Sequence, residues 1–368
     1  MSKISIVELP ADKFWQVGAL ASNYLWDSVC VVGYPNPDHP DVDNSYVAVI
    51  QKSPVDDIYI LKPNIQLLQG YPAVSAFCIE PEGSDAYFGT GPAVDNTPYA
   101  LASAVASKAE IKNINPIAIP PLEDVAGLFF QATYNSYNNE VYIGAEEYYI
   151  QTKDPAFEGF YVVSATSKKV IRRLSVKLFD PSDKPAISKL KKMFIPGGVT
   201  ITSIYDAENV VDGRVSVPDV DGVAASVVNN LFVDNANNIL YAVVQHGESF
   251  ATIHYYDITP VKPANYKHLG HFLRWNGNVL DGFSAYNEDK KYVYLPVLGG
   301  SELSVVDLIQ QSIINSLALP VREDSSIAVM EYHRRGNVLF IASDPNNPDS
   351  QHTCTVMVIV DPEVRNVQ

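Results

Sequence analysis

Hydrophobic runs and polar turns alternate along the chain in a regular repeat. In each repeat, a polar turn leads into a short apolar strand that carries an aromatic residue. The clearest copies are Glu82–Tyr87, Asn138–Tyr142, Asn237–Tyr241, Asp289–Tyr294 and Arg335–Phe340, and weaker copies lie at Cys30 and Phe194. Successive copies are 46 to 57 residues apart. Repeats of this length with four short strands each are typical of propeller blades, so the sequence predicts an all-β, seven-bladed β-propeller with four-stranded blades.

The two ends of the chain have complementary patterns. Thr355–Asp361 has the pattern of a third strand, and too little chain follows it for a full fourth strand. Met1–Leu9 shows the alternation of an outer strand. We therefore predict that the N-terminal strand completes the last blade, closes the ring and removes an open sheet edge. The predicted blades, all in one domain of residues 1–368, are 16–62, 70–118, 124–177, 178–218, 222–272, 280–319, and 324–368 with 1–9.

Two hydrophobic residues followed by an aspartate end a later strand in several repeats. The aspartates are Asp206, Asp257, Asp307 and Asp361. An aspartate at the start of a turn accepts hydrogen bonds from the backbone amides of that turn. We interpret these aspartates as turn caps.

Composition excludes some classes of protein. The chain has 26 basic and 42 acidic residues and a formal net charge of −16, which argues against a nucleic-acid partner. No segment approaches the roughly 18 apolar residues of a membrane span, and the N-terminus lacks the pattern of a secretory signal. The cysteines Cys30, Cys78 and Cys354 are too sparse for a disulfide framework and predict buried free thiols. We expect a cytoplasmic protein without a membrane partner, with secretion after signal removal as the alternative.

One segment departs from the acidic balance. Nine of the 26 basic residues lie between Lys168 and Lys192. One interpretation is a docking patch for an acidic protein partner. The other is that lysines on outer strands prevent edge-to-edge association of sheets.

Two sets of loops lie on one face of a propeller. One set leads into the first strand of each blade, and the other joins the second strand to the third. Here they supply aromatic residues and two arginines, namely Trp15, Tyr71, Tyr148, Arg274, Trp275 and Arg322. Small-molecule sites combine apolar walls with a few convergent polar groups. We therefore expect these residues to line a pocket for a small organic ligand.

An aspartate directly precedes the first strand in several repeats. The residues are Asp124, Asp221, Asp281 and Asp324. Carboxylates from several blades would suit calcium, which prefers oxygen ligands. The alternative is that each aspartate caps a turn, because every copy of a repeat needs the same turn. His39 and His352 lie on corresponding loops and have the same two interpretations, as ligands of a transition metal or as members of ordinary polar loops.

His246 and Glu248 are the candidate catalytic residues. A histidine and a carboxylate near a ligand can share acid–base work. The remaining histidines of this region, His254, His268 and His271, fall on predicted strands or outer turns and are expected to be structural. The sequence lacks a nucleophile elbow, a nucleotide-binding glycine loop and a CxxC pair, so it identifies no reaction.

The repeats resemble those of the lactonase-like, YVTN-type seven-bladed propellers. The resemblance rests on Asp234–Val243, a polar turn before a Leu-Tyr strand, and on Val305–Asp307 with its following alternating strand. That superfamily includes lactone hydrolases and muconate-cyclising enzymes, but its active-site set of His, Glu and Arg has no residue-by-residue match here. In length and general character, the chain also resembles the propeller protein encoded in fungal trichothecene gene clusters.

These observations predict a propeller that binds a small organic molecule, and the resemblance implies a molecule of specialised metabolism. They leave open whether the protein only binds this molecule or also hydrolyses or cyclises an oxygenated metabolite. The alternative is a non-catalytic scaffold for protein interactions, with the Lys168–Lys192 segment as its contact surface.

Overall fold

The computed structural model describes residues 3–36, 40–56, 58–90, 100–107, 110–119, 125–176, 184–205, 210–276, 279, 283–346 and 353–364. These residues form antiparallel sheets and two short 3-10 turns, η1 (Pro263–Asn265) and η2 (Leu298–Gly300). The chain divides into two compact units, Met1–Ser175 with Val321–Gln368, and Val176–Pro320.

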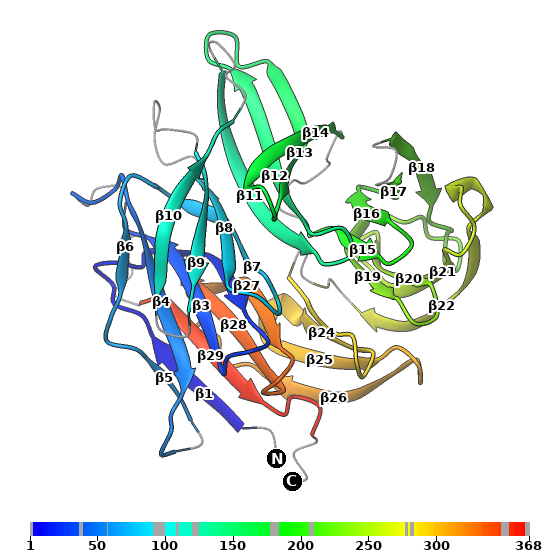
Figure 1. Ribbon diagram of the computed structural model, residues 1–368. Helices are drawn as coiled ribbons and strands as arrows, with labels where there is room; N and C mark the ends of the chain where they lie inside the picture. Colours follow the sequence, from blue (N-terminus) through cyan, green and yellow to red (C-terminus); the bar gives the residue numbers. More distant parts are fainter. Residues whose placement is uncertain are drawn as a thin grey trace. The chain divides into compact units, whose positions relative to one another are not determined.

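The first unit contains four sheets (Figure 1). The first sheet has the order β2 (Gln16–Ser22), β3 (Ser28–Tyr34), β4 (Ser45–Lys52) and β5 (Tyr59–Leu61), and β6 (Gln66–Leu68) also pairs with β4. The second contains β7 (Val74–Ile79), β8 (Asp85–Thr90), β9 (Leu101–Ala106) and β10 (Ile111–Ile117). The third contains β11 (Val125–Asn135), β12 (Glu140–Tyr149), β13 (Pro155–Ser164) and β14 (Lys169–Ser175). The last contains β27 (Ser325–His333), β28 (Val338–Pro345), β29 (Thr355–Val360) and β1 (Lys3–Glu8).

The second unit contains three sheets of four strands each. The first contains β15 (Ala186–Ser188), β16 (Lys192–Gly197), β17 (Thr200–Tyr205) and β18 (Val210–Ser216). The second contains β19 (Val227–Asp234), β20 (Ile239–His246), β21 (Phe250–Asp257) and β22 (Lys267–Asn276). The third contains β23 (Ala285–Asn287), β24 (Tyr292–Val297), β25 (Glu302–Asp307) and β26 (Ser312–Ala318).

These sheets are the blades of a seven-bladed β-propeller, and the predicted fold class is confirmed. The observed blades follow the predicted bounds closely because each blade is a run of consecutive strands joined by short turns. One detail differs, since the outer strand of the first blade is interrupted. Pro63 lies between β5 and β6 and has no N–H to donate, so both strands pair with β4 but do not join.

Hydrophobic patterning distinguishes inner from outer strands. The middle strands β3, β4 and β28 are buried along most of their length and consist largely of valine, isoleucine and other apolar residues. Such continuous runs are expected where both faces of a sheet are covered. The outer strands are more exposed: β26 has exposed residues at alternate positions along most of its length, and β10 is buried only at its two ends. Each blade therefore packs through the faces of its inner strands and exposes its outer edge.

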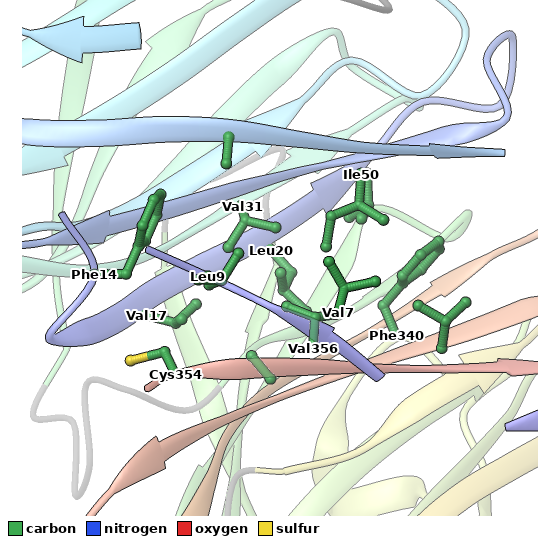
Figure 2. Close-up of a cluster of buried hydrophobic side chains, with 14 of the residues drawn as sticks. Val7, Leu9, Phe14, Val17, Leu20, Val31, Ile50, Phe340, Cys354 and Val356 are labelled. Carbon is green, nitrogen blue, oxygen red and sulfur yellow. The ribbon is translucent and has the colours of Figure 1, made fainter. Parts of the chain in front are cut away.

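The N-terminal strand is the outer strand of the last blade, as predicted. β1 pairs antiparallel with β29 from Lys3 opposite Val360 to Glu8 opposite Thr355. Val7 and Leu9 enter a core of buried side chains that includes Val356 (Figure 2). The backbone N–H of Leu9 also donates to the carbonyl of Cys354, at 3.0 Å. The two ends of the chain thus share one sheet and one core.

A bulge recurs in the innermost strands and links neighbouring blades. In β2, β7 and β19 the register shifts around Gly18, Ser75 and Asn229. The Ser75 hydroxyl donates to the carbonyl of Phe129 in the next blade, and the Asn229 amide donates to the carbonyl of Val279, at 2.9 Å. At Gly18 a side chain has no room, because a Cβ would lie 2.1 Å from the carbonyl oxygen of Val74. The extra residue of each bulge is therefore the contact with the following blade.

The structure confirms that two of the repeated aspartates are turn caps. Asp257 accepts the N–H of Thr259, at 2.9 Å, and Asp307 accepts the N–H groups of the two residues that begin its turn. Asp361 instead accepts the side-chain amide of Asn337. Asp206 lies outside the described residues.

All three cysteines are buried and outside any disulfide, as predicted. In the described part of the chain, no helix has the length and apolarity needed to cross a membrane.

Candidate functional site

One end of the blade β19–β22 brings together three of the residues predicted for a site. β19 begins there, β20 ends at His246, β21 begins at Phe250, and β22 ends just after Arg274. The loop before β19 reaches the same end through a tight turn in which the backbone of Val220 pairs with that of Val223. Asp221 is at the tip of this turn with φ 52°, a left-handed conformation that aspartate tolerates.

Arg274 forms the exposed part of the site. Its Nη1 donates to Asp221 Oδ2 at 2.7 Å, and the two side chains are 51% and 70% exposed. The guanidinium lies over the ring of Phe250, 3.8 Å from its centre. A cation at this distance from an aromatic face is held by the ring quadrupole as well as by the ion pair. Arg274 is therefore positioned on two sides while remaining accessible.

His246 lies beneath Phe250. The two rings stack with centroids 5.0 Å apart and an interplanar angle of 20°. His246 is fully buried, with Nδ1 3.2 Å from the carbonyl oxygen of Val223 and Nε2 3.0 Å from Thr252 Oγ1. Burial lowers the pKa of His246 below its ordinary value, so the imidazole is neutral at neutral pH. We call Arg274, Phe250 and His246 the Arg274 stack.

The acid–base role of His246 and Glu248 stays a prediction. Glu248 is exposed in the turn between β20 and β21, whereas His246 is covered by Phe250, which is itself 1% exposed. A ligand at Arg274 would therefore meet Phe250 before it met His246.

The predicted aromatic wall is distributed over both units. Trp275 is buried in the core between the blades β19–β22 and β23–β26. In the first unit, Tyr71 packs edge-on against Phe88, with ring centroids 5.0 Å apart, and Tyr148 lies under the ammonium of Lys153.

Two further predicted site residues lie in the first unit. Trp15 is half-buried at the start of the first blade, and its backbone carbonyl accepts a hydrogen bond from the thiol of Cys354. Arg322 pairs with Glu8 at 3.0 Å. The pocket predicted from all these residues together stays a prediction.

The predicted calcium site rests on aspartates with different surroundings. Asp124 and Asp281 lie outside the described residues, as do His39 and His352. Asp221 is paired with Arg274, and the backbone carbonyl of Asp324 accepts the N–H of Asn346. Among the residues that the structure describes, no group of three or more His, Cys, Asp or Glu is arranged to hold a metal ion.

Several cations of the Lys168–Lys192 segment are engaged within the fold. In the first unit, Lys168 pairs with Asp85, Arg172 pairs with Glu140, and Arg173 pairs with Glu147. The carboxylate of Glu147 is fully buried, and the Arg173 guanidinium lies 4.1 Å from the centre of the Phe157 ring. Among the residues of this segment that the structure describes, the exposed lysines are Lys169 in the first unit and Lys184, Lys189 and Lys191 in the second, and Lys177 lies outside the described residues. The docking patch stays a prediction.

Lys192 is a buried structural cation, and its reversal is expected to be costly. The residue is 2% exposed, and its ammonium donates to the carbonyls of Ile258 and Pro260 and lies over the ring of Tyr266. A carboxylate there would face carbonyl oxygens without a donor. We expect Lys192→Glu to lower the free energy of unfolding by about 3–5 kcal/mol, measured by urea denaturation.

The adjacent residue supplies the control for this change. Lys191 is exposed, so Lys191→Glu is expected to change stability by no more than about 0.5 kcal/mol. Equal stability of the two variants would contradict the structural role of Lys192.

Sequence reasoning missed the partners of His246. His254 on β21 lies 3.3 Å from His246, measured between their Nε2 atoms, and it also contacts His268 on β22. Strand alternation could have indicated that His254 lies near His246, because Phe250, Thr252 and His254 fall on one face of β21. Strand register, which places His271 opposite His254, was not readable from the sequence.

Comparison with known proteins supports the fold alone. No family model matches the chain, and no curated protein matches its sequence. Hydrazine synthase of Kuenenia stuttgartiensis has a similar structure, with a TM-score of 0.63, 10% identity, and coverage of 94% of this chain and 96% of that chain. Raptor of Chaetomium thermophilum gives a TM-score of 0.58 at 10% identity over 96% of this chain and 28% of that chain.

Proposed function

We propose that this β-propeller binds a small oxygenated metabolite carrying a carboxylate, with Arg274 as its anchor. The observation that supports the proposal is an accessible guanidinium held in place by Asp221 and the Phe250 ring. A pre-positioned guanidinium loses little conformational freedom on binding and can form paired hydrogen bonds to a carboxylate. Asp221 would be partly displaced or would bind a hydroxyl of the same ligand.

We also propose that the protein belongs to the lactonase-like, YVTN-type group and that its ligand is a compound of specialised metabolism. Hydrolysis or cyclisation of the ligand would need a group for proton transfer at its surface. His246 would supply it only after Phe250 moved, so binding is the primary proposal and catalysis the extension of it.

The test uses a thermal-shift and calorimetric panel of short mono- and dicarboxylic acids with their methyl esters. We expect some acids, but not their esters, to raise the melting temperature. Arg274→Ala should weaken binding of the best acid by about tenfold to a hundredfold, since a charged hydrogen bond is lost. Arg274→Lys should recover only part of the affinity, because lysine lacks the planar fork.

Arg335→Ala is the matched control, because Arg335 is also an exposed arginine near a carboxylate, 58% exposed and 4.0 Å from Asp27. It should bind the acid as the unmodified protein does. Equal loss in both variants, or binding unaffected by Arg274→Ala, would refute Arg274 as the anchor.

A further inference from the structure

Three histidine side chains form a hydrogen-bonded chain across the blade β19–β22. His268 Nε2 lies 3.1 Å from His254 Nδ1, and His254 Nε2 lies 3.3 Å from His246 Nε2. Strand pairing explains the arrangement, since residues opposite one another in a sheet project from the same face. His246 on β20 is opposite Phe250 on β21, and His268 on β22 is opposite Tyr256 on β21. Phe250, His254 and Tyr256 lie at alternate positions of β21, so they project from one face of the sheet together with His246 and His268. We call His246, His254 and His268 the histidine chain.

The carbonyl of Val223 fixes the direction of these hydrogen bonds. A carbonyl only accepts, so His246 carries its proton on Nδ1 and uses Nε2 as an acceptor. His254 then donates from Nε2 and accepts at Nδ1, where His268 donates from Nε2. In the neutral chain every donor meets an acceptor. One added proton is accommodated on Nδ1 of His268, at the open end of the chain, with these hydrogen bonds unchanged. A second added proton leaves two N–H groups facing each other across one of the His–His contacts.

The chain leads from the surface into the core. His268 is half-buried, whereas His254 and His246 have no exposed surface. Beside the chain, the ring of Tyr256 lies 5.0 Å from that of His268, and the exposed His271 lies 5.5 Å from His254. An incoming proton would therefore first reach the outer strand β22, which carries both His268 and His271.

Among the described residues, the charged groups near the histidine chain include Asp219, Lys192 and Arg274, whose guanidinium lies over the Phe250 ring that stacks on His246. At the His246 end, Asp219 in the loop before β19 favours protonation of His246. From the neighbouring blade β15–β18, Lys192 approaches Tyr266 at the base of β22, but its ammonium is held by carbonyls of the segment after β21. The blade β15–β18 also contributes the apolar residues Ala186, Phe194, Ile201 and Val215 to this core, and the hydroxyl of Ser203 lies 3.4 Å from that of Tyr266.

Burial holds the chain in its neutral state. Burial first, and then the charges of the neighbouring histidines, lower the pKa of His254 to about 3. Burial also lowers the pKa of His246 and of His268, the latter with repulsion from His271. A histidine whose pKa is lower in the folded than in the unfolded state stabilises the fold fully above the unfolded pKa of about 6.5. That stabilisation is lost as the pH falls below this value.

We propose that the histidine chain is an acid-sensitive latch that releases the outer strand β22 when the chain takes up protons. β22 is the edge strand of its blade, and its pairing with β21 is interrupted by two register shifts. Edge strands with broken ladders open at lower free energy than central strands. His268 and His254 bridge β22 to β21 by side chains, so proton uptake weakens the contact that crosses this interrupted pairing.

Hydrogen–deuterium exchange of the full chain tests the latch. Exchange is followed at about pH 7.5 and about pH 5, with labelling times scaled for the intrinsic pH dependence of exchange. Peptides covering β22 should exchange at least about tenfold faster at the lower pH, while peptides covering β14, an outer strand of the first unit, should not. Equal protection of β22 at both pH values would overturn the proposal.

Variants show whether the histidines are responsible. His254→Gln should reduce the acid effect on β22 to less than about threefold, because the central titrating group is gone. If that variant does not fold, His268→Gln at the half-buried end should still move the opening to lower pH, since one like charge is removed. His333→Gln, which replaces a buried histidine bonded to the carbonyl of Asn23 in the first unit, should keep the full effect. An acid effect undiminished in both chain variants would refute the latch.

Discussion

Deleting residues 1–9 is expected to lower the free energy of unfolding of the first unit by about 5 kcal/mol, or to prevent its folding. Burial of Val7 and Leu9 contributes about 1.5–3 kcal/mol for each side chain. Their removal also leaves the core partners on β29 and β28, such as Val356 and Phe340, open to solvent (Figure 2). Finally, the edge of β29 loses its hydrogen-bonded partner. Thermal and urea unfolding of the truncated protein measure this effect.

Two point variants distinguish the contribution of buried side chains to stability from that of the backbone pairing of β1. Leu9→Ala is expected to cost about 2–5 kcal/mol, because a leucine that is 1% exposed leaves a cavity. Ile6→Ala, on the same strand but 50% exposed, should change stability by about 0.5 kcal/mol or less. An unchanged melting temperature in the truncated protein would contradict the closure of the last blade by β1.

Asp344 is expected to make the first unit less stable as the pH rises. Its carboxylate oxygens lie 3.0 and 3.1 Å from the backbone nitrogen of Val17, and the residue is 9% exposed. Burial outweighs the hydrogen bond from Val17 and raises the pKa of Asp344 to about 7. Since an unfolded aspartate has a pKa of about 3.9, the contribution of this group to stability is complete below about pH 4 and is lost as the pH rises through 7.

The expected size of this effect is about 3 kcal/mol between pH 5 and pH 8. Asp344→Asn cannot ionise but keeps an oxygen to accept the N–H of Val17. Urea unfolding at both pH values should therefore show Asp344→Asn gaining about 3 kcal/mol relative to the unmodified protein on going from pH 5 to pH 8. Asp221→Asn, at an exposed side chain of the second unit, should show no such gain. A parallel pH dependence of the unmodified and Asp344→Asn proteins would refute the assignment.

The blade architecture was predictable because it depends on local patterning. Each blade is a set of consecutive strands, and the aromatic after each polar turn, such as Tyr241 or Tyr294, is a buried residue at a fixed place in the blade. Even the pairing of the chain ends followed from counting strands. The interruption at Pro63 was missed because a proline on an outer edge breaks the ladder without ending the blade.

The site was less predictable because it depends on register and on side-chain direction. Asp221, Arg274 and His246 were each selected from loops near one face, and the structure does bring them to one end of a blade. Trp275 follows Arg274 in sequence yet points to the opposite face and into the core, as strand alternation requires. The links through Phe250 and His254 depend on cross-strand neighbours that composition and spacing do not reveal.

The pairing of β1 with β29 also has a consequence for folding during synthesis. The other blades form from contiguous segments and can fold as each segment leaves the ribosome. Among the described strands, β1 is made before all the others and its partner β29 is made after them. Until then, β1 is an unpaired strand with apolar residues and is open to wrong partners. We expect the charged residues at its two ends, Lys3 and Glu8, to keep the unpaired strand soluble until the last blade is complete.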